Sequence, residues 1–222
     1  MFKKQNNFIE KKIQDDIPPI KSLKGFHLKI VTSIAILWSI FQLWYASPFP
    51  IMLDFGVVKG LPARAIHLGF ALILAFLIFP FKKNGKISLL SIIIAILSFL
   101  CCLYIFIVYD DLVTRAGILL VVDFIFAGKE FKIPIEIIIG TFGIFFLLEA
   151  TRRVIGIPLV IVAVSFLIFS YFGRYFPELI SHAGLSLNRL IGYHWFDQEA
   201  IFGIPIGVSV RFIFLFVLFG SL

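Results

Sequence analysis

The sequence predicts an all-α, polytopic membrane protein with about six transmembrane helices and a cytoplasmic N-terminus. Hydrophobic residues make up 60% of the chain and charged residues only 15%, whereas soluble domains are about 45–50% apolar and about 25% charged. Several apolar runs are long enough to cross the bilayer core, which needs about 20 residues as a helix. The period-2 alternation of membrane strands is missing from these runs, so helices are favoured.

Six apolar runs define the predicted spans. The first three lie at Leu28–Ala46, Ala63–Phe81 and Ile87–Tyr109. The stretch from Ile133 to Phe172 would be ~60 Å long as one helix, about twice the bilayer core. It is therefore predicted to form two helices with a tight turn near Arg153 to Gly156. The final run, Ile201–Leu222, is the predicted sixth span.

The basic residues predict the orientation. Twelve Lys and Arg fall in the N-terminal segment and in the turns after the second and fourth spans, against seven in the segments on the other side. Because cytoplasmic loops carry the excess of Lys and Arg, the N-terminus should be cytoplasmic. The predicted organisation is a basic tail at 1–27, a four-helix scaffold region at 28–151, and two further helices at 152–222.

Two segments on the outer side are too long for simple turns. The first, at about 110–132, contains the mostly apolar run Leu112–Ala127 and is predicted to hold a helix lying in the membrane interface. A seventh span is the alternative, and it would invert everything after it. The second, at about 174–200, is predicted to be a short amphipathic helix followed by an exposed stretch, Tyr193–Glu199.

Catalytic and metal-binding motifs are missing from the sequence. It contains no Gly-x-x-x-x-Gly-Lys phosphate loop and no Gly-x-Ser-x-Gly elbow. His27 and His67 are predicted at opposite ends of the membrane, while His182 and His194 share an outer loop without the spacing of a zinc site. The chain is therefore predicted to be neither an enzyme nor a carrier of a metal or cofactor.

The best-placed acidic residue inside a predicted span is Glu149, which lies close to two arginines. Glu149 precedes Arg152 and Arg153 by three and four residues, so one helical turn brings it to either guanidinium. We interpret these residues and Gly156 as a structural hinge. A proton-relay or ion-binding role is the alternative, because acids inside the membrane are functional candidates.

The final run contains a possible helix-packing face and an isolated charge. Gly203 and Gly207 are four residues apart and bracket Pro205, a spacing that lets another helix approach closely. A flexible entry to the helix is the alternative interpretation. Arg211 lies near the middle of the run, where a charge is costly in lipid, and no partner for it is evident in the sequence.

These residues resemble a known family. Glu149-Ala150-Thr151-Arg152-Arg153, followed by Gly156, resembles a motif in the fused permease of TRAP transporters (tripartite, ATP-independent, periplasmic), of the 4TM/12TM type that works with TAXI-type binding proteins. The block from Glu199 to Ser209 is similar to the next block of that family. The pattern Tyr109, Leu112, Arg115, Gly117 and Asp123 also resembles the family's segment between its third and fourth helices.

The resemblance implies a symport system of the bacterial inner membrane. In such systems an extracytoplasmic binding protein delivers an organic solute, and a sodium or proton gradient drives its uptake. The chain would be only the N-terminal portion, inactive alone, either a truncated product or one half of a split permease. Its expected partners are the bilayer, the remainder of the permease and the binding protein, which would contact Glu178, Asp197 and Glu199.

The sequence also departs from the family, and two other functions compete. The family position corresponding to Arg211 is usually small and uncharged, and no substrate or ion ligand of the family maps to a residue of this chain. A non-transporting membrane anchor or assembly protein is the main alternative. A membrane enzyme is the third hypothesis, weakened by the missing nucleophile–base pair.

Overall fold

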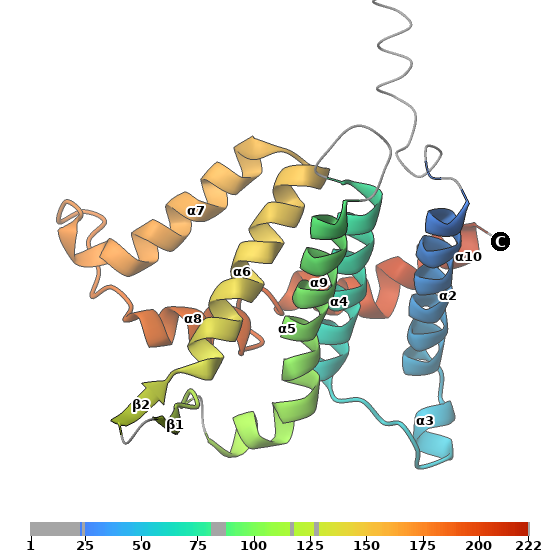
Figure 1. Ribbon diagram of the computed structural model, residues 1–222, viewed down its shortest axis with the longest axis horizontal. Coiled ribbons are helices and arrows are strands. Elements are labelled where there is room, and N and C mark those ends of the chain that lie inside the picture. The colour runs from blue at the N-terminus through green and yellow to red at the C-terminus, as the bar shows by residue number, and fades with distance from the viewer. Residues whose placement is uncertain (1–22, 24, 81–87, 116–117, 127–128, 222) are drawn as a thin grey trace, which may run out of the picture.

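Helices form about three-quarters of this computed structural model, which describes residues 23, 25–80, 88–115, 118–126 and 129–221. Four upright helices stand side by side in Figure 1: α2 (Phe26–Ala46), α4 (Gly60–Ile78), α5 (Leu89–Thr114) and α6 (Ile135–Val154). The short α3 (Phe49–Met52) follows α2. The central helix α4 contacts α2, α5 and α6, and it has more buried residues than α5 or α6.

The helices after α6 lie beside and across this bundle. Helix α7 (Ile157–Phe172) slopes away from α6 and is followed by a 3-10 turn, Gly173–Tyr175. Helix α8 (Leu187–Trp195) packs on α6. The last helix consists of α9 (Ile204–Val208), a π turn (Ser209–Ile213) and α10 (Phe214–Gly220), and it lies across the upright helices in Figure 1.

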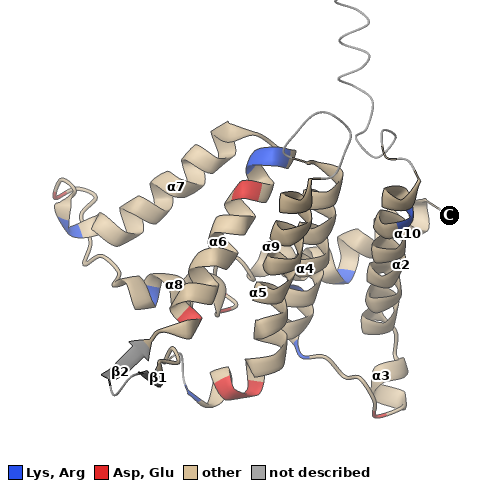
Figure 2. Cartoon of the chain, viewed as in Figure 1, with Lys and Arg blue, Asp and Glu red and all other residues tan. Residues whose placement is uncertain are grey.

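Among the residues that the structure describes, four helices are long and apolar enough to cross a membrane, which indicates a multi-pass membrane protein. They are Phe26–Ala46, Gly60–Ile78, Leu89–Thr114 and Ile157–Tyr175. Large apolar side chains such as Ile36, Leu37 and Phe166 are more than half exposed, and soluble monomers rarely expose such continuous apolar surface. Figure 2 shows Lys, Arg, Asp and Glu mostly at helix ends and in connections. Long uncharged stretches of helix, drawn in tan, lie between them.

The prediction of a helical protein with several helices of membrane length is therefore confirmed. The chain also turns between α6 and α7, where Ile155 and Gly156 separate the two helices. The last helix is shorter than its predicted span, because it covers Ile204–Gly220 only.

The predicted interfacial helix at about 110–132 is wrong. Helix α5 continues to Thr114, and the rest of that segment holds an antiparallel hairpin of β1 (Val122–Phe126) and β2 (Lys129–Ile133). Val122 pairs with Ile133 and Phe126 with Lys129. The strands are rich in Val, Ile and Phe, which favour the pleated backbone. The alternative of a seventh span over Leu112–Ala127 is excluded for the same reason.

Candidate functional site

The corner between α6 and α7 contains the first candidate group. Glu149 binds Arg152 through two hydrogen bonds, from Nε to Oε2 at 2.7 Å and from Nη2 to Oε1 at 2.8 Å. Arg153 donates from Nε to the same Oε1 at 2.8 Å. The predicted pairing at i+3 and i+4 is therefore present in the last turns of α6.

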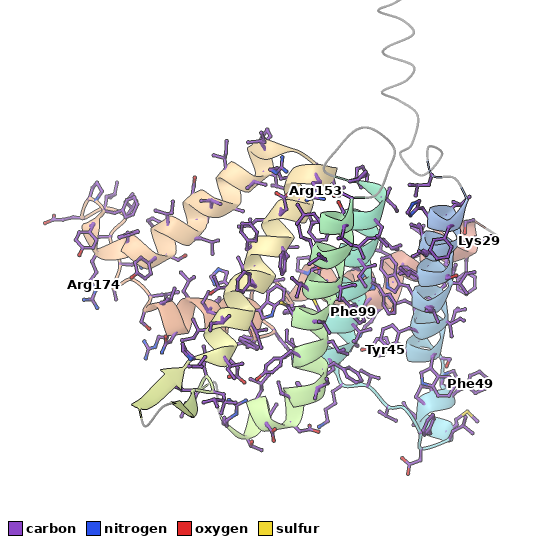
Figure 3. All side chains as sticks on the ribbon, viewed as in Figure 1. Lys29, Tyr45, Phe49, Phe99, Arg153 and Arg174 are labelled. Atoms are coloured by element: carbon purple, nitrogen blue, oxygen red, sulfur yellow. The ribbon has the colours of Figure 1, made fainter. Side chains whose placement is uncertain are left out.

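Arg153 also connects this corner to α4. Its side chain is only 6% exposed, and its Nη1 donates to the carbonyl of Phe79, the residue that ends α4, at 3.3 Å. The guanidinium lies 4.9 Å from the centroid of the Phe76 ring, a cation–π distance. Figure 3 shows Arg153 where the upper end of α6 meets the neighbouring helices.

Gly156 directly precedes α7 and has a backbone conformation that only glycine adopts readily. Its φ is +121°, outside the region that side chains with a Cβ favour. Both oxygens of Glu149 accept from arginine, so each of them takes part in fixing the corner. This geometry suits a structural joint between α6 and α7 better than a proton carrier, which needs a free oxygen.

A second polar group lies at the opposite end of the bundle, and the sequence analysis did not single it out. Glu136, in the first turn of α6, is fully buried. Its carboxylate accepts from Arg115 Nη1 and Nη2 at 3.0 and 2.6 Å, from the Tyr104 hydroxyl at 3.1 Å and from the Leu120 N–H at 2.6 Å. Four donors from α5 and the residues that follow it thus meet at one carboxylate of α6.

This arrangement satisfies a buried charge that would otherwise be costly. A buried carboxylate is tolerated when it is paired and its remaining lone pairs are bonded. The hydrogen bonds to Glu136 raise the pKa of Arg115 above its ordinary value. Arg115 and Glu136 are 21 residues apart, and only their opposite charges, on either side of one connecting segment, hinted at the contact in the sequence.

The third polar group lies between α2, α4 and the last helix. His67 Nδ1 is approached by Trp38 Nε1 at 3.2 Å and by Gln42 Nε2 at 2.7 Å. His67 Nε2 lies 3.1 Å from Ser209 Oγ, and Gln42 Nε2 donates to the carbonyl of Val210 at 3.3 Å. The prediction that His67 lies at the end of a span is wrong, because it is buried in the body of α4.

The π turn explains why the backbone takes part in this group. A π turn inserts an extra residue into a helix, and such turns are frequent at functional sites. Here Ser209 and Val210, at the start of the turn, reach the two polar side chains of α2 and α4. Gln42 is fully buried, and its Oε1 has no hydrogen-bond partner among the described residues.

The residues of the predicted packing face have different surroundings. A Cβ on Gly207 would meet the guanidinium of Arg64 at 2.9 Å, so α4 does approach the last helix at this position. Gly203 instead lies in a turn and donates its N–H to Ala200 at 3.0 Å, with Pro205 in the first turn of α9. Arg211 lines a cavity of about 410 Å³ beside the end of α2.

The three acidic residues predicted to contact a binding protein are all exposed. Glu178 lies between the 3-10 turn and α8, whereas Asp197 and Glu199 follow α8. The prediction that the whole stretch Tyr193–Glu199 is exposed is wrong, because Trp195 is fully buried. A Cβ on Gly140 or Gly143 of α6 would overlap Ile191 or Trp195, so two glycines of α6 form the surface on which α8 packs.

The described residues contain no group of three or more His, Cys, Asp or Glu that could hold a metal ion. No family model, curated protein or solved structure matches the chain. The function must therefore be argued from the residues and the geometry described above.

Proposed function

We propose that this chain is the N-terminal part of a TRAP-type secondary transporter permease. In this proposal it is a multi-pass protein of the bacterial inner membrane with about six spans and a cytoplasmic N-terminus. It assists the ion-gradient-driven uptake of an organic solute that an extracytoplasmic binding protein delivers. The chain is not an enzyme, and it is inactive without the rest of the permease.

The observation that carries this proposal is the corner at Glu149, Arg152, Arg153 and Gly156. These residues make up the motif that resembles the family, and they join two different parts of the fold. On one side of the corner α4, α5 and α6 pack into a compact bundle. On the other side α7 slopes away with no buried residue. A compact bundle joined to a helix without buried residues fits a chain whose second half packs against further protein.

The last helix supports the same division of the chain. It lies across the upright helices, and Gln42 and His67 hold it at the π turn. Its outer face is apolar and exposed, with Phe216 and Val217 more than two-thirds accessible. Lipid or a further helical part can cover this face. In a TRAP-type permease the larger, transporting part would do so.

Transport can be tested in the source cell by deleting the gene and measuring the uptake of labelled carboxylic acids. We expect uptake of at least one acid to fall to background and to return with the wild-type gene. Uptake should also stop when an ionophore collapses the sodium or proton gradient. Unchanged uptake of every acid, together with loss of another membrane protein from its complex, would instead support the anchor or assembly function.

A further inference from the structure

A cleft of about 500 Å³ opens between the end of α5 and α8. Tyr109 of α5 forms one wall, Arg189 and Tyr193 of α8 form another, and Asp197 follows on the turn after α8. Its size lies within the range of small-molecule sites, which are mostly apolar with a few polar groups. None of the three polar groups described above, around Glu149, Glu136 and His67, lines this cleft.

The cleft lies at the boundary of the bilayer core. About 20 helical residues cross that core, and from the first residue of α5, Leu89, this length ends near Tyr109. Beside Tyr109, Lys59 and Asp110 form an ion pair with exposed side chains, and the Lys59 ammonium lies 5.2 Å from the Tyr109 ring centroid. Tyrosines and the first charges typically mark the headgroup level. This depth does not depend on which side of the membrane the cleft faces.

Two opposite charges line the cleft, and they do not pair with each other. In the part of the chain that the structure describes, the Arg189 guanidinium has no ion-pair or hydrogen-bond partner. Among the described residues, the Asp197 carboxylate accepts only the backbone N–H of Gln198, at 2.6 Å. A ligand that carries a negative and a positive group would meet a partner for each.

Apart from Asn188 and Gln198, the remaining lining is apolar, and it continues onto the exposed apolar surface. Leu61 and Phe196 are buried beneath the cleft, while Val113 and Ile118 at its edge are 61% and 73% exposed. An amphiphile could therefore place a polar head between the charges and its chains along the edge. A soluble zwitterion would gain nothing from this apolar edge.

We propose that the cleft binds one molecule of phosphatidylethanolamine. Arg189 would bind the phosphate, since guanidinium groups match phosphate geometry with two N–H donors. Asp197 would accept from the primary ammonium, and the acyl chains would follow Val113 and Ile118. An anionic headgroup without an ammonium would leave Asp197 beside a second negative charge, and a trimethylated ammonium offers no N–H to it.

Native mass spectrometry of the purified full chain in detergent tests this site. After delipidation, the protein is titrated with dioleoyl phosphatidylethanolamine, phosphatidylcholine or phosphatidylglycerol, or with soluble glycerophosphoethanolamine. We expect one phosphatidylethanolamine to bind at least tenfold more tightly than either other lipid. Glycerophosphoethanolamine should not bind in the same range. Equal binding of all three lipids, or equal binding of the soluble headgroup, would overturn the proposal.

Two variants test the roles of Arg189 and Asp197 separately. Arg189→Gln should weaken phosphatidylethanolamine binding about tenfold, and Asp197→Asn should remove the preference over phosphatidylcholine. Arg174→Gln is the matched control, because it removes an exposed arginine that does not line the cleft, and it should change neither result. Circular dichroism and gel filtration confirm that each variant is folded. If folded Arg189→Gln and Asp197→Asn proteins bind the three lipids as the wild type does, the site is wrong.

Discussion

Arg115 and Glu136 join the end of α5 to the start of α6 through two hydrogen bonds, one at 3.0 Å and one at 2.6 Å. The Glu136 side chain is inaccessible, whereas that of Arg115 is a quarter exposed. The pair spans the connection that contains the β1–β2 hairpin. It therefore ties the two ends of that connection together at this end of the bundle.

We expect Glu136→Gln to lower the free energy of unfolding by about 3 kcal/mol, because removing one partner of a buried pair leaves the other uncompensated. Unfolding of the detergent-purified protein in increasing SDS, followed by circular dichroism, measures the change. Glu178→Gln is the control: Glu178 is exposed, and such substitutions usually change stability by less than about 0.5 kcal/mol. Equal effects of the two substitutions would show that the buried pair does not stabilise the fold.

The contact between α6 and α8 depends on Gly143. A Cβ at this position would overlap the ring of Trp195, which is fully buried and rigid. We expect Gly143→Ala to destabilise the protein by about 2 kcal/mol, since overpacking a filled core costs about 1–3 kcal/mol. The same SDS titration measures it.

Gly60→Ala is the matched control for Gly143→Ala, because nothing lies within 4 Å of a Cβ at Gly60. It should leave stability almost unchanged. The double variant Gly143→Ala, Trp195→Leu should lose less stability than the sum of its single variants, because the smaller side chain makes room for the methyl group. Additive losses would mean that the two residues are not in contact.

The long helices could be predicted from the sequence because length and apolar composition are local properties. Helices α2, α4 and α5 each follow from one long apolar run, and α7 follows from dividing a run that is too long for one span. The β1–β2 hairpin could not be predicted from the sequence, because a short apolar run is equally compatible with a buried helix and with a strand. The salt bridge of Glu149 with Arg152 and Arg153 was predictable, because the residues have helical spacing. The salt bridge of Glu136 with Arg115 was not, because it depends on how α5 and α6 pack against each other.

The two arginines of the corner should differ in importance. Arg153 is nearly buried and reaches α4, while the side chain of Arg152 is 41% exposed. We expect Arg153→Gln to cost about 2–3 kcal/mol of stability, because it also leaves Glu149 short of a partner. Arg152→Gln should cost less than about 1 kcal/mol, as is usual for exposed pairs. SDS unfolding of both variants decides this, and a larger loss for Arg152→Gln would contradict the joint described here.

The proposed orientation predicts which positions a membrane-impermeant reagent can reach. In a Cys101→Ala, Cys102→Ala background, Glu178→Cys should react with an impermeant maleimide in intact spheroplasts, because residue 178 would lie in an outer loop. Lys4→Cys should react only after the membrane is permeabilised, because basic segments stay on the cytoplasmic side. Labelled bands on a gel measure both reactions. The reverse pattern would place the N-terminus outside, and it would also put Glu178, Asp197 and Glu199 out of reach of an extracytoplasmic binding protein.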